Sequence, residues 1–410
     1  MFTNHYSISF VQGSADYHDL AYPAHFYPLN HMFTQTMTIA RNAFFESIRQ
    51  PIVLVLVLAA TLLLMLSSPL SAFTMENDQR MLLDIGLATV FMIGMLLAIF
   101  VASTVLGNEI RNKTTLTVVS KPVGRPQFVA GKFLGAAAAI TLSTLYVALV
   151  FALVEQQEVF QTVRVPVHIP VVVFGILSFV ISTAVAIWCN YFYSFVFSST
   201  WLCISTPLLA VSYILVLNFE PDFSSQPIWS TFKPDIWKAI ILILVSVLIL
   251  GSIATALSTR LSQLGTLIAT ILIFFLGMMS DAWFSKPMYD IEQRWIDRAS
   301  IEGKAELVEH TRLMVKTNGD IEEVTTERLQ VADNVTLSTF AEDMEYPAWV
   351  GYRVGSAVIP NFQILWLADA LTQENVIPTR YVVRTSIYGG FYIIAAISIG
   401  VILFQRREVS

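Results

Sequence analysis

Long runs without a charged residue dominate this chain of 410 residues. The longest extends from Val165 to Phe219 and holds no Asp, Glu, Lys or Arg. A helix needs about 20 consecutive apolar residues to cross the hydrocarbon core of a bilayer. This run therefore predicts membrane-spanning helices rather than a soluble core. The composition agrees, because 55% of the residues are hydrophobic and 13% are charged, with a mean hydropathy of +0.64.

The charge-free runs predict an all-α polytopic membrane protein with about eight transmembrane helices. Six runs of suitable length each predict one helix: Gln50–Met75, Ile85–Asn108, Phe133–Val154, Ala239–Thr259, Leu261–Ser280 and Thr385–Gln405. The run from 165 to 219 predicts two helices, because the polar and aromatic stretch 190–194 favours an interfacial turn. The run 261–280 is short, so it either spans the membrane or forms a re-entrant segment.

Basic residues in the short loops predict the orientation. Cytoplasmic loops carry an excess of Lys and Arg, and with eight spans both termini share one side. Ten basic residues lie on that side: Arg41, Arg49, Arg111, Lys113, Lys121, Arg125, Lys132, Arg260, Arg406 and Arg407. Four lie in the other short loops: Arg80, Arg164, Lys233 and Lys238. We therefore expect both termini in the cytoplasm and the segment 281–380 outside.

The segment before the first span has an amphipathic pattern. Within Thr38–Gln50, apolar residues fall on one helical face and polar residues on the other. The apolar residues are Ile39, Ala43, Phe44 and Ile48. This pattern predicts an in-plane helix at the membrane surface within a cytoplasmic N-terminal segment, residues 1–50. A frayed juxtamembrane helix without a mechanical role is the alternative.

The segment Asp281–Arg380 carries 26 of the 54 charges, with 9 basic and 17 acidic residues for a net charge of −8. The stretch Tyr289–Val315 is compatible with a helix. The turn signal Asn318–Asp320 between two short apolar stretches predicts a β-hairpin. We expect a small α+β exoplasmic domain over 281–383, then the last span and a cytoplasmic tail over 384–410.

Four apolar residues near the end of this segment are expected to rest on the membrane surface: Phe362, Leu365, Trp366 and Leu367. The domain itself has several open roles. It gates a pathway, seals a dimer, holds an exoplasmic partner or serves only as a structural cap.

The predicted spans contain no residues that indicate ion or nucleotide binding. No predicted span contains a charged residue, which argues against ion-coupled transport because a driving ion needs a binding group inside the bilayer. The chain has no nucleotide site, since the segment Gly124–Phe133 has six residues between its glycines and Phe133 in place of Ser or Thr. A basic nucleic-acid footprint is also excluded by the net charge of −6.

The sequence also lacks clear motifs of enzyme active sites and of metal sites. The sequence has no HExxH or GxSxG motif, and its two cysteines, Cys189 and Cys203, form no CxxC pair. The histidines before residue 35 lack the spacing of a metal site. We expect no catalytic residues, no metal and no cofactor in this chain. An intramembrane enzyme would need Thr61, Ser143 and Ser182 to converge in a wet cavity.

The loop 108–132 after the second span is the most informative segment. Its apolar residues, including Leu116, form a stripe flanked by charges, and Pro122 ends the helix because the residue before a proline is pushed out of the α region. A short amphipathic helix between two spans is a suitable contact for a partner protein. A basic loop that only fixes orientation is the alternative.

At these residues the chain resembles the permease subunits of ABC-2 type transporters. The family pattern E-x-x-x-(K/G)-T-x-x-x-(L/V)-x-(S/T)-x-P-x-x-R is matched by Glu109, Lys113, Thr114, Val118, Ser120, Pro122 and Arg125. The segment 38–50 looks like the family's elbow helix, and the ending 403–408 looks like its F-x-R-R-(E/D) terminus. The subgroup annotated for multicopper-enzyme maturation is the most similar, around 119–123 and 359–363. Family members usually have six spans, and eight are expected here.

The resemblance implies an exporter permease in the bacterial inner membrane, working as a homodimer or with a related permease. A coupling helix would dock into a separate cytoplasmic ATPase, which would bind ATP and Mg²⁺. The residues expected at this contact are Glu109, Arg111, Lys113, Thr114, Leu116, Ser120, Lys121, Pro122 and Arg125, with Arg260 as a second contact. The substrate stays open. The alternative is a membrane scaffold or assembly protein whose exoplasmic domain holds a partner.

Overall fold

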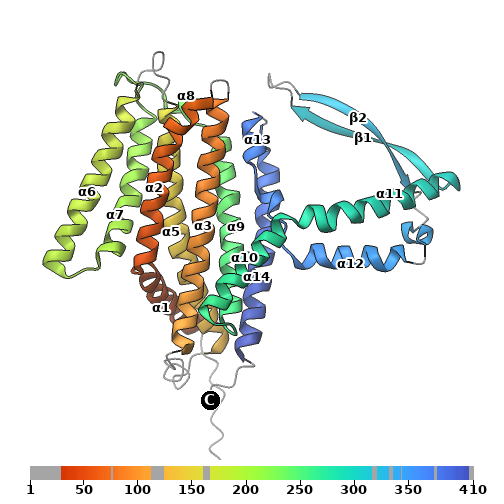
Figure 1. The fold of residues 1–410 in the computed structure, drawn as a ribbon, viewed down its shortest axis with the longest axis horizontal. Helices are drawn as coiled ribbons and strands as arrows, with labels where there is room; N and C mark the ends of the chain where they lie inside the picture. The colour runs from red at the N-terminus through yellow and green to blue at the C-terminus, as the bar shows by residue number, and fades with distance from the viewer. Residues whose placement is uncertain are drawn as a thin grey trace, which may run out of the picture.

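In the part of the chain that the structure describes, seven helices are long and apolar enough to cross a membrane, and they form the body of the protein (Figure 1). The structure, a computed structural model, describes residues 29–74, 77–111, 124–159, 167–315, 321–331, 336–342, 344–373 and 376–405. The seven helices are α2 (Pro51–Ser71), α3 (Asp78–Arg111), α5 (Arg125–Gln157), α6 (Ile169–Tyr193), α7 (Phe197–Val216), α9 (Pro234–Ser258) and α14 (Thr379–Gln405). The chain is therefore a helical multi-pass membrane protein.

The remaining elements are shorter. The α-helices are α1 (Leu29–Ile48), α8 (Ile228–Thr231), α10 (Gln263–Met278), α11 (Lys286–Ile301), α12 (Glu345–Val358) and α13 (Ala368–Thr372). Short 3₁₀ turns are η1 (Ala72–Thr74), η3 (Leu337–Phe340) and η4 (Gln363–Leu365), and η2 (Asp281–Ser285) is a π-helical turn. The strands β1 (Ala305–Val315) and β2 (Ile321–Val331) form an antiparallel pair.

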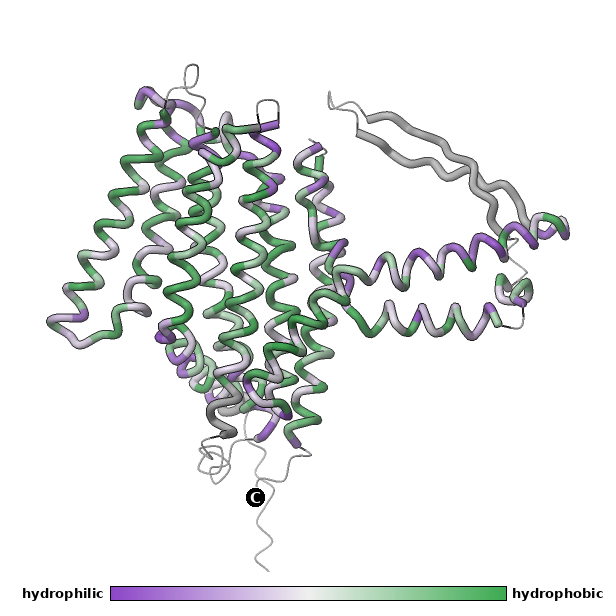
Figure 2. Tube along the Cα trace, in the orientation of Figure 1, coloured by the Kyte–Doolittle hydropathy of each residue, from purple (hydrophilic) through white to green (hydrophobic). Residues whose placement is uncertain are grey.

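The central helices of the bundle are α3, α5 and α9. In their most apolar stretches 72%, 67% and 67% of the residues are buried, against 22% in α6 and 17% in α14. Figure 1 shows α6 at one edge of the bundle and α14 beyond α9 on the other side. The turns 194–196 and 259–262 and the end of α14 lie at the lower end in this view, and the connection 217–233 lies at the upper end. Figure 2 shows hydrophilic residues gathered at these ends and along α11.

Local sequence signals set where the helices begin and end. Prolines occupy the first turn of α2, α5, α6 and α9, where their missing N–H costs no helical hydrogen bond. Ser194 ends α6 in the left-handed conformation with φ of 56°, in the expected interfacial turn. The boundary between the two helices of the long run is thus confirmed.

The helices are longer than the charge-free runs that predict them. The helix α5 begins at Arg125 and ends at Gln157, so it includes Lys132 and Glu155, which are 4% and 2% exposed. The prediction of charge-free spans is correct for their middles and wrong for the ends of α5. Ion pairs at both ends allow these charges to be buried.

The predicted span 261–280 differs most from expectation. Its helix, α10, has only 16 residues and is followed by a 55° bend into α11, so it stands apart from the seven long helices. The π-helical turn at Asp281–Ser285 lies at this bend. A bent pair of this kind is either a broken span or a re-entrant loop, and the bend itself was not predicted.

The helices α11 and α12 run side by side away from the bundle, and the strand pair runs back from their far end toward the bundle (Figure 1). We call residues 286–358 the side arm. The predicted helix 289–315 is wrong in its second half, because α11 stops at Ile301 and the chain continues as β1. Gly303, with φ of +67°, lies in the turn between them and explains the break. The predicted hairpin is present, and Val315 pairs with Ile321.

The chain returns from the side arm into the bundle. Phe362 and Leu365 are fully buried, and the Phe362 ring lies 5.9 Å from that of Phe274 on α10. The expectation that these residues rest on the membrane surface is wrong, since the space between α3, α9 and α10 receives them. Two tyrosines of α14 hold the segment. The Tyr388 hydroxyl accepts a hydrogen bond of 3.0 Å from the Asn361 N–H, and the Tyr392 hydroxyl donates one of 2.7 Å to the Ala357 carbonyl oxygen.

Close helix contacts depend on small residues. A Cβ atom at Gly86 of α3 would lie 2.0 Å from the ring of Phe151 on α5. A Cβ atom at Gly135 of α5 would lie 2.2 Å from the Ala40 carbonyl oxygen on α1. Helices in a bilayer associate largely through van der Waals contact, so these glycines let the backbones approach.

Replacing Gly135 by leucine should separate α1 from α5. The added side chain meets backbone atoms that cannot rotate away, and overpacking of this kind costs about 1–3 kcal/mol. We expect a lower thermal unfolding midpoint in detergent, followed by intrinsic fluorescence. Gly390→Leu in α14 is the matched control, because a Cβ there meets nothing within 4 Å. Equal midpoints for the two variants would contradict the close packing of α1.

Candidate functional site

The predicted docking residues that the structure describes lie at the lower end of the bundle. Glu109 and Arg111 belong to the last turn of α3, which continues further into the predicted loop than expected. Arg260 is exposed in the turn between α9 and α10. The other predicted contacts, Lys113, Thr114, Leu116, Ser120, Lys121 and Pro122, lie outside the described residues.

Arg125 has a structural contact that the sequence did not indicate. It begins α5, and its guanidinium donates a hydrogen bond of 3.0 Å to the carbonyl oxygen of Gln405 at the end of α14. Cationic groups at the last carbonyls of a helix stabilise its C-terminus. Arg125 therefore ties the loop after α3 to the end of the last span.

The helix α1 lies against the first half of α5. Ala43, Ser47 and Ile48 are fully buried on its inner face. Glu46 of α1 forms an ion pair of 2.9 Å with Lys132, whose side chain is 5% exposed. The apolar face predicted for 38–50 thus packs on protein, and α1 begins earlier than expected, at residue 29.

A polar cavity of about 640 Å³ opens at the upper end of the bundle, between the starts of α3 and α9 and the end of α5. Its walls carry both signs of charge: Asp78, Arg80, Glu155, Lys233 and Asp235. This mixed lining offers hydrogen bonds and charges of both signs, without a preference for one ionic class.

Glu155 is the buried charge of this cavity. Its side chain is 3% exposed and forms an ion pair with Lys233, which is 48% exposed. Gln156 donates to its second carboxylate oxygen at 3.0 Å. The sequence did not predict this buried group, because Glu155 directly follows the charge-free run Phe133–Val154 and so lies outside the predicted span.

Removing the ammonium group of Lys233 should show how much the burial of the Glu155 carboxylate destabilises the fold. We expect Lys233→Met to lower the free energy of unfolding by about 1–3 kcal/mol, reduced from the fully buried case by the exposure of Lys233. Adding Glu155→Gln should recover most of the loss. The comparison uses unfolding midpoints of the two single variants and the double variant. Additive losses in the double variant would contradict a coupled pair.

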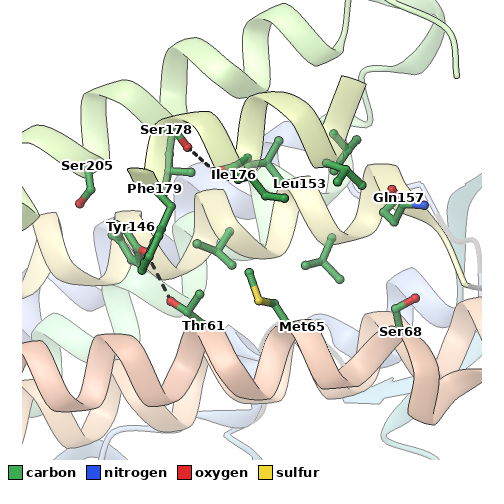
Figure 3. A pocket seen from close by; sticks show the side chains of 16 residues that line it. Thr61, Met65, Ser68, Tyr146, Leu153, Gln157, Ile176, Ser178, Phe179 and Ser205 are labelled. Atoms are coloured by element: carbon green, nitrogen blue, oxygen red, sulfur yellow. Dashed lines mark hydrogen bonds between the residues drawn. The ribbon is translucent and has the colours of Figure 1, made fainter. Parts of the chain in front are cut away.

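A second cavity, of about 300 Å³, lies inside the membrane-spanning region between α2, α5, α6 and α7 (Figure 3). Its wall is mostly aliphatic and aromatic, with the hydroxyl groups of Thr61 and Tyr146 3.4 Å apart on one side. Ligand pockets commonly combine an apolar wall with a few polar groups. We call it the membrane cavity.

The three hydroxyl residues that an intramembrane enzyme would need do not converge. Thr61 lines the membrane cavity, whereas Ser143 and Ser182 are buried and donate to the carbonyl oxygens of Ala139 and Phe179 on their own helices. Among the described residues, no group of three His, Cys, Asp or Glu side chains is placed to hold a metal ion. The arrangement gives no nucleophile with a partnering base.

Two tryptophan hydrogen bonds, one in each direction, join the helices α11 and α12 of the side arm. Trp295 of α11 donates to Glu345 of α12 at 2.8 Å, and Trp349 of α12 donates to Glu292 of α11 at 2.9 Å. Arg298 adds two hydrogen bonds to Glu345, of 2.6 and 3.1 Å. The Arg298 guanidinium, with help from Trp295, holds the pKa of Glu345 far below its usual range.

The lowered pKa predicts how the side arm responds to acid. A carboxylate with a depressed pKa stabilises the fold fully above its ordinary value of 4.5, and this contribution is lost as the pH falls below 4.5. We expect the ¹⁹F signal of 5-fluorotryptophan at Trp295, assigned with Trp295→Phe, to shift only in that acid range. In Glu345→Gln the shifted signal should be present at pH 7.

The exposed ion pair of Glu302 with Lys304 provides the control for that experiment. Glu302→Gln removes an equal charge from the same arm and should leave the Trp295 signal unchanged at pH 7. An unchanged signal in Glu345→Gln would contradict the role of Glu345.

Scans against protein-family models, curated proteins and solved structures each return no match.

Proposed function

We propose that this chain is the membrane-spanning permease subunit of an ATP-driven ABC-2 type exporter, coupled to a separate cytoplasmic ATPase subunit. The support is the motif from Glu109 to Arg125, together with the amphipathic helix before the first span. ATP and Mg²⁺ would bind in the ATPase. This chain would contribute the docking surface and the pathway.

One observation carries the proposal. The predicted docking segment, Glu109 to Arg125, runs from the last turn of α3 to the first residue of α5, two of the three most buried helices. A push on a loop at the edge of a bundle would move one peripheral helix. A push on this loop acts on two central helices at once, which is what coupling of ATP hydrolysis to the spans requires.

Neighbouring elements at the lower end support the same mechanism. Arg125 connects the start of α5 to the end of α14, and the Glu46–Lys132 pair connects α1 to α5. When two ATPases close on ATP, the displaced docking segments would carry α5 together with these attached helices. The lower end would then face the cytoplasm of a bacterial inner membrane.

The bundle leaves room for a second permease copy. The helices α6 and α14 are largely exposed, since only 22% and 17% of the residues in their most apolar stretches are buried. A homodimer, or a pair with a related permease, would cover part of one of these faces. The remainder would face lipid.

The docking residues can be tested together. We expect Glu109→Ala with Lys113→Ala to lower ATPase association by at least about tenfold, since truncating interfacial charge partners commonly costs more than the 1.4 kcal/mol that a factor of ten represents. The measurement is affinity purification in mild detergent, with quantitative mass spectrometry and an ATPase assay of the eluate. The size-exclusion profile should stay that of the folded protein.

A matched control exists in the side arm. Glu302→Ala with Lys304→Ala removes one acidic and one basic residue far along the chain from the docking segment, and association should be unchanged. Unchanged co-purification of the ATPase with the docking variant would refute the proposal.

A non-transporting scaffold is the second candidate, and the side arm favours it. The arm extends sideways from the bundle and carries a strand pair that runs back from its far end, which suits the capture of an exoplasmic partner (Figure 1). Recovery of exoplasmic proteins without any ATPase in the same purification would support this function instead.

A further inference from the structure

The membrane cavity is an unassigned feature inside the bundle, and its walls are hydrocarbon. Buried α5 residues Val150 and Leu153 line one side, and Leu209 of α7 lines another. Figure 3 shows the cavity between the ribbons of α2, α5 and α6, with Ser68 and Gln157 at the same end of it. An aqueous solute would lose its hydration here without gaining hydrogen bonds, so the cavity suits an apolar occupant.

The cavity opens sideways toward the bilayer. Met65 of α2 and Ile176 and Phe179 of α6 line it and are also 60%, 59% and 44% exposed. Lining residues with exposed side chains mark the mouth of a cavity. The helix α6 packs chiefly on α7, so the gap between α2 and α6 stays open. A ligand therefore reaches this site from the surrounding lipid.

Its depth matches one leaflet. Tyr146 and Gln157 line the cavity and lie eleven positions apart on α5, which corresponds to about 16 Å at 1.5 Å per residue. Half of a hydrocarbon core about 30 Å thick is about 15 Å. The cavity thus extends from the middle of the membrane to the upper end of the bundle.

The upper end of the cavity is polar. Ser68 donates to the Glu158 carbonyl oxygen at 3.0 Å. The Gln157 amide, in the orientation that satisfies both groups, pairs with the backbone of His168 at 3.1 and 3.3 Å. His168 is 7% exposed, and its Nδ1 has no hydrogen-bond partner in the described part of the chain. The polar groups that line this end of the cavity are those of Ser68 and Gln157.

We propose that the membrane cavity binds one acyl chain of a phospholipid from the leaflet at the upper end, with the headgroup beside Ser68 and Gln157, which line that end of the cavity. The apolar wall holds the chain, the hydroxyl pair of Thr61 and Tyr146 lies at mid-membrane depth, and the polar end meets the ester region of the lipid. The site is independent of the proposed transport function, because it needs neither ATP nor a partner subunit.

Gly175 of α6 provides the means to close the site. It lines the cavity, and a Cβ atom there would meet nothing within 4 Å. A leucine at this position therefore extends into empty space and occupies the volume that a chain would need. Gly390 of α14 also has open space at its Cβ but does not line the cavity, so Gly390→Leu is a matched control.

The test uses the full chain in vesicles of phosphatidylethanolamine and phosphatidylglycerol that contain a phospholipid with a diazirine in one acyl chain. After illumination, labelled residues are mapped by mass spectrometry. We expect labels at Val150 and Leu153, which are buried and line the cavity, and none at Leu149 and Phe151, which are buried on the same helix outside it. Lipid on the outer surface reaches neither pair.

Gly175→Leu should lower labelling at Val150 and Leu153 by roughly tenfold, which corresponds to the loss of about two buried methylene groups. Gly390→Leu should leave it unchanged. The comparison within the unmodified chain does not depend on folding of the variant, and it tests the proposal by itself.

Four results would overturn the proposal. Equal labelling of the lining and non-lining pairs, or labelling unaffected by Gly175→Leu in a folded variant, would mean that no chain occupies the cavity. Labelling by a diazirine fatty acid but not by the phospholipid would exclude a phospholipid as the ligand. Crosslinks from Met65 to a second copy, with Val150 and Leu153 unlabelled, would show that protein covers the mouth.

Discussion

Close contact of α3 with α5 and α9 through small side chains is the interaction on which the rest of the bundle depends. Lipid tails are as apolar as leucine, so helices in a bilayer gain little from burying apolar surface against each other and depend on packing. Gly86 receives the Phe151 ring, and a Cβ at Gly94 would lie 2.8 Å from Val247 of α9. These contacts fix the three central helices, and the peripheral helices pack around them.

The two buried charges of α5, Lys132 and Glu155, are both paired. Lys132 pairs with Glu46 near one end of α5, and Glu155 pairs with Lys233 near the other. Each pair also joins α5 to a different element, α1 in the first case and the start of α9 in the second. The ion pairs thus reduce the cost of burial and fix the position of α5 along the membrane normal.

The helix α5 connects all the candidate functional features. It follows the predicted docking segment, contacts α1, lines the membrane cavity from Tyr146 to Gln157 and contributes Glu155 to the polar upper cavity. A displacement at Arg125 would therefore reach both cavities through one rigid element. In the proposed permease this helix would transmit motion, and a lipid chain beside it would respond to its position.

Hydrophobic run lengths alone determined the membrane class, the seven long helices and the turn at Ser194, because a bilayer admits only helices of sufficient apolar length. Turn chemistry likewise predicted the strand pair of the side arm. The sequence did not reveal the bend after α10, the burial of Phe362 or the pairing of Glu155, because each depends on residues distant in the chain. Only the tertiary structure decided which faces meet, since packing and pairing in a membrane are set by the shape of neighbouring helices.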